Sequence, residues 1–386
     1  MKLLYSTLTI AGSSNGPGVN ELTFVESLLK SDQIDVRVLV PVQSKKYIQN
    51  DNRVLFFPCL NSKFFLFFNQ FIQFSYLLYL TYLFRPRAYV FRVGFFPVFL
   101  AMLSIFIQKP IFIKTAAPPT NNWLLAQKGI KGYLSSIVMP LHSFLVTAIY
   151  RRSSVIDACT EQIVGKIKPL LIGCKATLIH IENSVDIDKF QPNRRNLRDG
   201  ITIGFAGGLP LERGAMEILQ VVRRLRLNGL NVDGFIVGGS ANDASKLKLI
   251  SKEYNISNYI KICGKVPFSK IPELMRYINI GVAFDLPDRV QDIGNSNQKI
   301  RQYLACGLPV ITSINSAPDL CDNLIVHCVD PKNTDSIASI ITDYQNKNSS
   351  EKQLLQNNAR EIAVSSYSSS HLLNKRVVEW KKIFNS

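Results

Sequence analysis

Two glycines near the N-terminus could bring backbone N–H groups close to an anion. Gly16 and Gly18 follow an apolar run and precede a segment with leucine and valine on one helical face. Glycine permits a close approach of the backbone, and a helix N-terminus attracts negative charge. The spacing is not that of a GxGxxG dinucleotide fingerprint. We therefore expect either a plain turn or a loop that contacts an acceptor or a diphosphate.

A second glycine pair and a basic residue follow another apolar run. The sequence ITIGFAGGLPLERGAMEIL, residues 201–219, places Gly207 and Gly208 after the run and Arg213 before a helical segment. A guanidinium offers paired donors that match a phosphate. Arg213 is thus either a phosphate ligand or an ordinary solvated arginine at a helix start.

A third segment, residues 292–313, combines helix-capping residues with a short apolar face. Asn295 and Asn297 are typical N-cap residues, Ile300 and Leu304 give the following helix a buried face, and Gly307 ends it. The N-terminus of this helix could receive a diphosphate or a sugar.

These segments, with the crossing sequence LIHIENSVDIDKFQP of residues 178–192, resemble the family-four (group 1) glycosyltransferases of the GT-B fold. The positions of the crossing sequence in register with the family pattern are Asn183, Val185, Asp186, Phe190 and Pro192. Ser184 stands where the family usually has glycine. We interpret the D-x-D pattern of Asp186 and Asp188 as part of this motif and not as a metal site. The likeness covers nearly the whole chain and is strongest from Leu178 onward.

The resemblance implies an α/β protein in which two Rossmann-like, doubly wound domains face a central cleft, and a nucleotide-diphosphate sugar, UDP- or GDP-linked, as donor substrate. It implies no bound cofactor and no metal. The residues that it places at the donor are Gly207, Gly208, Arg213, Gly294, Asn295, Asn297, Lys299 and Gln302.

The sequence departs from the family pattern at the positions expected to do chemistry. Gly294 and Gln302 occupy places where many members have glutamate, and Ala116 stands where a histidine is common. Gln302 can still hydrogen-bond ribose hydroxyls. Gly294 cannot replace a carboxylate, so Asp292 is the candidate catalytic residue, and no general base is identified. The resemblance implies a hexosyltransferase that retains anomeric configuration.

Short apolar runs alternate with helix-length segments along the chain, which predicts βαβ units on parallel sheets. We expect domains at 1–192 and 193–370, a polar linker over 191–200, and a C-terminal helix, 371–386, that packs on the first domain. The expected strands are 3–10, 35–40, 54–58, 88–93, 111–115, 155–160, 177–181, 201–206, 234–237, 259–262, 280–284, 310–312 and 323–327.

The composition indicates a partner that is anionic. Lysine and arginine total 45 against 28 acidic residues, a formal charge of +17. The sequence has no ribonucleoprotein motif, zinc finger or long basic block, so we expect no nucleic acid partner. The cysteines are odd in number, 7, with no CxxC pair, which favours a reducing compartment, the cytoplasm.

Three uncharged stretches, 64–84, 93–108 and 133–150, fall where the alternating pattern needs helices, and polar residues or prolines interrupt each of them. We expect burial or interfacial contact and not membrane spans. The first stretch is rich in Phe and Tyr and is flanked by Lys63, Arg85 and Arg87, a combination suited to an anionic bilayer surface. It predicts peripheral association with the inner membrane and a lipid-linked saccharide acceptor.

The function predicted from the sequence is a glycosyltransferase that moves a sugar from a nucleotide donor onto a membrane-associated acceptor. The acceptor would be lipid-linked or of the lipopolysaccharide type, as in bacterial O-antigen or capsule synthesis. Three alternatives stay open. They are a sugar-nucleotide epimerase of the same fold, a non-catalytic nucleotide-sugar-binding subunit, and a membrane-anchored structural protein.

Overall fold

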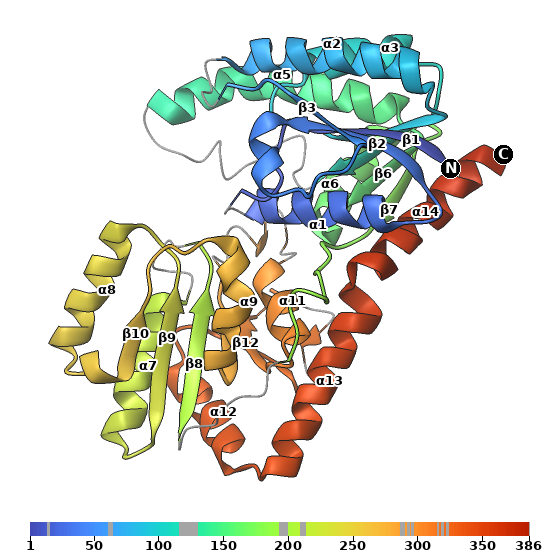
Figure 1. The fold of residues 1–386 in the computed structure, drawn as a ribbon. Helices are drawn as coiled ribbons and strands as arrows, with labels where there is room; N and C mark the ends of the chain where they lie inside the picture. The colour runs from blue at the N-terminus through green and yellow to red at the C-terminus, as the bar shows by residue number, and fades with distance from the viewer. Residues whose placement is uncertain are drawn as a thin grey trace. The chain divides into compact units, whose positions relative to one another are not determined.

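A computed structural model describes residues 1–13, 16–60, 65–115, 130–192, 200–208, 214–285, 290–291, 294, 297–314, 316–317, 320–321 and 324–385. The chain divides into two compact units (Figure 1). Unit 1 comprises Met1–Asn183, Gln291–Gly294 and Ser369–Ser386, and unit 2 comprises Ser184–Val290 and Asn295–Ser368. The expected linker lies largely outside the described residues, and the units divide before it, between Asn183 and Ser184.

Unit 1 is built on a parallel sheet of seven strands in the order β3-β2-β1-β4-β5-β6-β7. The strands are β1 (Lys2–Ser6), β2 (Asp35–Pro41), β3 (Val54–Phe57), β4 (Ala88–Arg92), β5 (Ile111–Thr115), β6 (Val155–Ala158) and β7 (Thr177–His180). The strand order reverses direction between β1 and β4, the point at which doubly wound sheets bind ligands outside their carboxyl ends.

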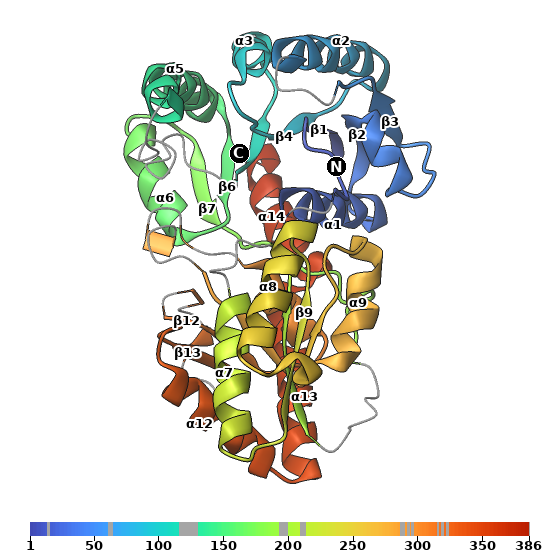
Figure 2. The ribbon, with the colours of Figure 1, turned by 90° about the vertical axis from the view of Figure 1, so that its left-hand side faces the viewer.

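Helices cover both faces of the first sheet (Figure 2). One face carries α1 (Gly16–Lys30) and α14 (Ser369–Asn385), and the other carries α2 (Leu66–Phe84), α3 (Val98–Phe106) and α5 (Ile130–Arg152). Shorter helices are η1 (Val42–Lys46), α6 (Glu161–Ile167) and η3 (Lys168–Leu171). Because both faces are covered, the strands are apolar on both sides, as expected of a parallel sheet.

Unit 2 contains a parallel sheet of six strands in the order β10-β9-β8-β11-β12-β13. Its strands are β8 (Ile201–Ala206), β9 (Val232–Val237), β10 (Ile260–Ile262), β11 (Ile280–Ala283), β12 (Val310–Ser313) and β13 (Val326–Val329). Figure 2 shows α7 (Ala215–Leu227) and α8 (Ala241–Glu253) in front of this sheet. The other helices are η5 (Ser257–Tyr259), η6 (Phe268–Lys270), α9 (Ile271–Leu274), η7 (Met275–Tyr277), α11 (Gln298–Ala305), α12 (Thr334–Asn346) and α13 (Ser349–Tyr367).

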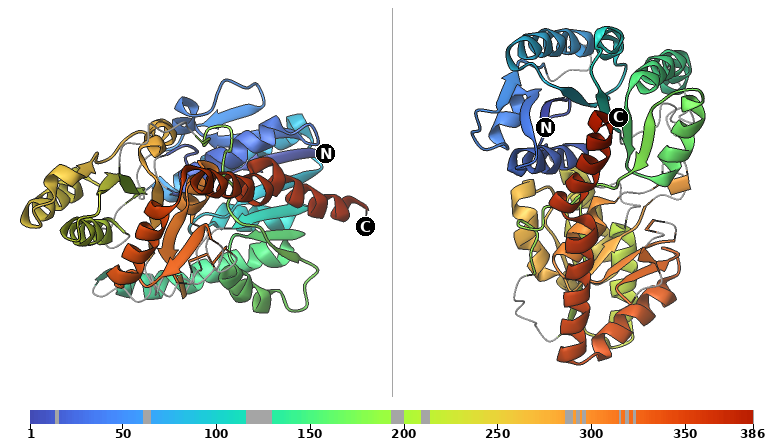
Figure 3. Two further views of the ribbon diagram at one scale, coloured as in Figure 1. Left: turned by 90° about the horizontal axis from the view of Figure 1, so that it is seen from below. Right: turned by 90° about the vertical axis from the view of Figure 1, so that its right-hand side faces the viewer.

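The last two helices belong to different units (Figure 3). The chain leaves unit 2 after Ser368, and α14 packs its apolar side on the first sheet, where the Trp380 ring stacks on Phe112 with centroids 5.2 Å apart. Val185, just after the first passage between units, forms a β-bridge with Ser368, just before the last. The predicted fold class, α/β with two parallel sheets, is confirmed.

Cys321 and Cys328 are joined by a disulfide, which the odd cysteine count and the absence of CxxC did not predict. The reducing compartment therefore stays a prediction. Among the helices that the structure describes, none combines the length and the apolar character needed to cross a bilayer.

Candidate donor site

The candidate site of unit 2 lies where the carboxyl end of β8 meets α11. A Cβ atom built on Gly207 would lie 2.8 Å from Cε of Lys299, so the glycine gives room for the lysine stem. The ammonium of Lys299 lies 4.4 Å from the ring centroid of Phe205, the penultimate residue of β8. Gly207 and Lys299, two of the residues predicted at the donor, thus lie next to each other in this unit, and their role at a donor stays a prediction.

The N-terminus of α11 is held in place by its cap. The side-chain oxygen of Asn297 accepts a hydrogen bond of 3.0 Å from the backbone N–H of Lys299. This cap fixes the start of an eight-residue helix, whose dipole adds positive potential beside the Lys299 ammonium. A lysine and a helix N-terminus together favour a ligand with two or more negative charges.

Tyr303 connects α11 to the sheet through a buried hydrogen bond. Its hydroxyl accepts a hydrogen bond of 2.9 Å from the backbone N–H of Ala206, at the end of β8. The ring occupies the space that a side chain at Gly281 of β11 would need. Burial raises the pKa of Tyr303 well above its usual value, so the hydroxyl stays neutral at any ordinary pH. The sequence indicated a buried residue here, but its hydrogen bond depends on a strand 97 positions away.

The other predicted donor residues are distributed differently. Gln302 is only 5% exposed on α11, and Gly208 has open space around its Cα atom. Arg213, Asp292 and Asn295 lie outside the described residues. The helix expected after Arg213 begins at Ala215, with Gly214 as its N-cap at a φ of +119°.

Gly294 is grouped with unit 1 and not with the donor residues of unit 2. Its φ is +67°, and an added Cβ would lie 2.8 Å from Cβ of Thr160. A glutamate at this position would therefore be both strained and crowded. The departure from the family pattern has a local structural reason.

The N-terminal glycines of unit 1 differ from each other. Gly18 is buried and its carbonyl accepts a hydrogen bond of 2.7 Å from the N–H of Gly12, which closes the turn before α1. Gly16 is exposed, with nothing within 4 Å of an added Cβ. The turn needs Gly18, whereas Gly16 leaves the helix N-terminus open to a ligand.

The crossing motif packs on unit 2. Asp186 accepts hydrogen bonds from the backbone N–H groups of Asp188 and Lys189, at 3.0 and 3.1 Å, and its carboxylate lies 3.2 Å from the Lys189 ammonium. Arg360 of α13 donates to the carbonyls of Ile187, Phe190 and Ala305. Asp186 thus has a structural role in the turn, in agreement with our reading of the D-x-D pattern. Within the described part of the chain, no three His, Cys, Asp or Glu side chains gather as a metal site would require.

A buried charge cluster in unit 1 escaped the sequence analysis. Glu21 of α1 accepts a hydrogen bond of 2.5 Å from Arg92 at the end of β4, and its other near cation is Lys114 of β5, at 3.9 Å. Burial lowers the pKa of Lys114 to about 8, opposed by the nearby Glu21 carboxylate. Next to them, Asp157 of β6 pairs with Arg376 of α14. The only signal in the sequence was a basic residue at the end of one strand, Arg92, and one before the end of the next, Lys114.

Comparison with known proteins gives one family and a set of similar folds. Residues 200–346 match the model of the family described as glycosyl transferases group 1. No curated relative matches the sequence. The matched segment contains Gly207, Asn297, Lys299 and Gln302 of the candidate site, so the match and the geometry concern the same part of unit 2.

Solved structures resemble the whole chain. Sucrose-phosphate synthase from Thermosynechococcus elongatus superposes with a TM-score of 0.73 at 11% identity, covering 99% of both chains. HepE from Anabaena, in complex with UDP and glucose, gives 0.69 at 15% identity, also covering 99% of both. WaaG, a glycosyltransferase involved in lipopolysaccharide biosynthesis, gives 0.66 at 10% identity, covering 97% of this chain and 98% of that one. At such identities the likeness shows the fold.

Proposed function

We propose that this protein, in which the predicted likeness to group 1 glycosyltransferases of the GT-B fold is confirmed, transfers a hexosyl group from a nucleotide-diphosphate sugar to a membrane-associated saccharide. The observation that carries the proposal is the meeting of Lys299, Gly207 and the capped N-terminus of α11. HepE, of similar fold, has been solved with UDP, which supports UDP as the nucleotide here. WaaG supports an acceptor of the lipopolysaccharide type.

In the proposed reaction the site stabilises the leaving diphosphate. As the bond from the anomeric carbon to the phosphate oxygen breaks, negative charge grows on the diphosphate. The Lys299 ammonium and the N-terminal N–H groups of α11 are already oriented, because Asn297 caps the helix and Tyr303 ties it to β8. Fixed positive groups that face a developing charge lower the barrier without reorganisation.

Titration calorimetry with UDP, GDP, ADP and CDP tests the donor site. We expect one of them, UDP first, to bind, and the corresponding nucleotide sugar to be consumed when a lipid-linked saccharide is added. No heat with any of the four diphosphates would remove the proposal.

A non-catalytic subunit that binds a nucleotide sugar is the second candidate. The left-handed backbone of Gly294 and the crowding around it leave no room for the carboxylate that many family members carry there. Donor binding without consumption in any lipid-linked acceptor mixture would favour this candidate over the transferase.

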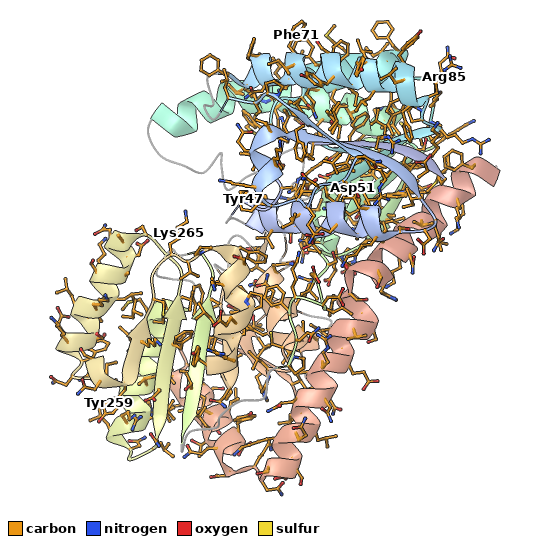
Figure 4. The ribbon with its side chains drawn as sticks, viewed as in Figure 1. Tyr47, Asp51, Phe71, Arg85, Tyr259 and Lys265 are labelled. Atoms are coloured by element: carbon orange, nitrogen blue, oxygen red, sulfur yellow. A yellow bond between two sulfur atoms is a disulfide. The ribbon has the colours of Figure 1, made fainter. Side chains whose placement is uncertain are left out.

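The acceptor side of the proposal rests on an aromatic face of unit 1, which we define as the outward side of α2 and α3. Figure 4 shows Phe71 on the outer side of α2 and Arg85 at the C-terminal end of that helix. The large apolar side chains exposed on this face are Phe67, Phe68, Phe71, Leu78, Tyr79, Tyr82, Leu83, Met102, Ile105 and Phe106.

Basic residues border the aromatic face. Arg85 and Arg87 are exposed at the end of α2, and Lys109 follows α3. Apolar and aromatic side chains beside basic ones suit the boundary between the headgroups and acyl chains of an anionic bilayer. We propose that this face holds the protein peripherally on the inner membrane, where a lipid-linked acceptor would be found.

A further inference from the structure

A pocket in unit 1 lies at the switch point of the first sheet. It opens between α2 and α3 above the carboxyl ends of β1 and β4 and is partly open to solvent. Its walls are mainly apolar and aromatic. They include Leu77, Phe91 and Leu103, each buried in the core under these helices. Concave apolar sites at such switch points are where α/β sheets bind ligands.

The polar groups of the pocket are few and mostly engaged with each other. Gln73 donates a hydrogen bond of 2.8 Å to the hydroxyl of Ser6, and Gln70 donates one of 2.9 Å to the carbonyl of Phe96. The latter bond orients the Gln70 amide, and among the residues that the structure describes its Oε1 atom has no hydrogen-bond partner, although Gln70 is only 3% exposed. A buried acceptor without a donor is costly. A ligand in the pocket that donates a hydrogen bond to this Oε1 atom would therefore satisfy it.

A path of aromatic rings connects this pocket with the aromatic face. The ring of Phe71, which is 52% exposed, lies 5.8 Å from that of Phe99. Phe99 lines the pocket and lies 5.9 Å from Phe74, which lines it too. An apolar chain that comes from the bilayer can thus follow apolar side chains into the pocket.

A free saccharide fits these walls poorly. A sugar ring carries several hydroxyl groups that must keep hydrogen bonds when buried. Besides Arg92, the polar side chains in the lining are those of Ser6, Gln70 and Gln73, and both amide groups already donate a hydrogen bond. Arg92 adds little, because its guanidinium is paired with Glu21 on the opposite face of the sheet. The lining matches an apolar chain with a single donor at its polar end.

We propose that the pocket holds the apolar chain of an amphiphilic acceptor, and that a hydroxyl or amide N–H next to the chain donates to Oε1 of Gln70. This deepens and rests on the proposed transfer to a lipid-linked acceptor. The shared chemistry covers a prenyl or an acyl chain. Recognition of the chain would position the acceptor independently of its sugar.

Two matched probes test this proposal by calorimetry below their aggregation concentration. N-octylacetamide has the chain and an amide N–H, and N-methyl-N-octylacetamide has the same chain without the donor. The wild-type protein is expected to bind the first about tenfold more tightly than the second, the scale of one buried hydrogen bond. In Gln70→Leu the two probes are expected to bind equally.

A substitution in the pocket wall provides the second arm. Leu100→Trp fills the pocket and is expected to abolish the binding of both probes, whereas Leu249→Trp, on the exposed side of α8, leaves it unchanged. If thermal unfolding shows that Leu100→Trp does not fold, Leu100→Phe takes its place. This variant must lower the affinity for both probes at least threefold.

UDP binding is measured on the same samples, which separates the two proposals. If the wild-type protein does not bind UDP, that result would count against the donor site alone. Absence of probe binding, or probe binding that Leu100→Trp and Leu100→Phe leave unchanged, would overturn the pocket proposal. Geraniol, with a branched prenyl chain, and octanol, with a linear chain, then distinguish a prenyl from an acyl-like chain, while binding of glucose without a chain would also overturn the proposal.

Discussion

Lys299 is the residue on which the donor proposal depends most directly. Its stem runs past Gly207 and its charge lies beside the capped end of α11, so the charge can be removed without disturbing the helix. Lys299→Met keeps most of the stem. We expect UDP to bind about 1.5–3 kcal/mol more weakly, the scale of a hydrogen bond to a charged group, with little change in thermal stability.

The matched control for this variant is Lys248→Met, on the exposed side of α8 in the same unit. It loses the same charge at a distance from the site, and we expect its UDP affinity to equal that of the wild type. Equal affinities in both variants would mean that Lys299 does not contact the diphosphate.

The lowered pKa of Lys114 predicts a specific dependence of stability on pH. Its pKa is lowered to about 8 in the folded protein from an ordinary value of 10.5, chiefly by burial. Between these values the unfolded chain binds more protons than the folded one, so the folded state gains stability as the pH rises. We expect the free energy of unfolding, relative to that of Lys114→Met, to increase by up to about 1.4 kcal/mol per pH unit between pH 8 and 10.

Urea unfolding of the two proteins at pH 7.5, 8.5 and 9.5 provides this measurement. Other groups titrate in both proteins, so only the difference is informative. Parallel pH profiles would show that Lys114 has an ordinary pKa and that the cluster around Glu21 is open to water.

At the residue scale the sequence predicted contacts between neighbours along the chain better than contacts across the fold. Asn297 as a cap followed from local spacing, whereas the grouping of Gly207 with Lys299 followed from the family resemblance alone. The hydrogen bond of Tyr303 to Ala206 and the pair of Asp157 with Arg376 join segments 97 and 219 residues apart. One sequence contains no signal that identifies such partners.

At the scale of elements, every strand expected from the alternation of apolar runs is found, with shifts at the ends. The first strand ends at Ser6 and not at Ile10, because the hydroxyl of Thr7 accepts from the N–H of Thr9 and turns the chain. The strand expected at 323–327 is shifted to Val326–Val329. Apolar composition locates a strand, whereas local hydrogen bonds of polar side chains decide where it ends.

The aromatic face of α2 and α3 predicts binding to anionic vesicles. A double variant, Phe71→Ser and Leu83→Ser, removes two exposed apolar side chains and should leave the core intact. Burial of apolar area drives interfacial binding. We therefore expect about tenfold weaker partitioning onto vesicles of phosphatidylglycerol and phosphatidylcholine, measured by sedimentation.

Leu249→Ser is the control for this experiment, because Leu249 of α8 is 59% exposed and Leu83 is 57% exposed. It should bind vesicles as the wild type does. Arg85→Ser with Arg87→Ser should remove most of the salt dependence of binding. Equal partitioning onto neutral vesicles, or none onto anionic ones, would contradict the proposed membrane surface.

At the scale of the whole molecule, the family resemblance predicted the two sheets and the fold, which the match over residues 200–346 and the solved structures support. The chain returns to unit 1 through α14, so that this face of the first sheet is covered only when residues 369–385 have been made. Leu373, Val377 and Trp380 bury their side chains against α1 and the sheet. Unit 1 is therefore expected to depend on the C-terminal helix for its stability.

The ion pair of Asp157 and Arg376 tests this dependence without deleting the helix. Both side chains are about 5% exposed or less, so Arg376→Met leaves the Asp157 carboxylate buried without its partner. Removal of one member of a buried pair typically costs about 3–5 kcal/mol, whereas replacement of both by apolar residues is often neutral. We expect Arg376→Met to lower the unfolding temperature of unit 1 markedly and Asp157→Leu with Arg376→Met to restore most of it. UDP affinity, measured by calorimetry at low temperature, should be unchanged in both variants because Lys299 belongs to unit 2. If the single variant unfolds as the wild type does, α14 is not held by this pair, and the apolar contacts of Leu373, Val377 and Trp380 attach it to the first sheet.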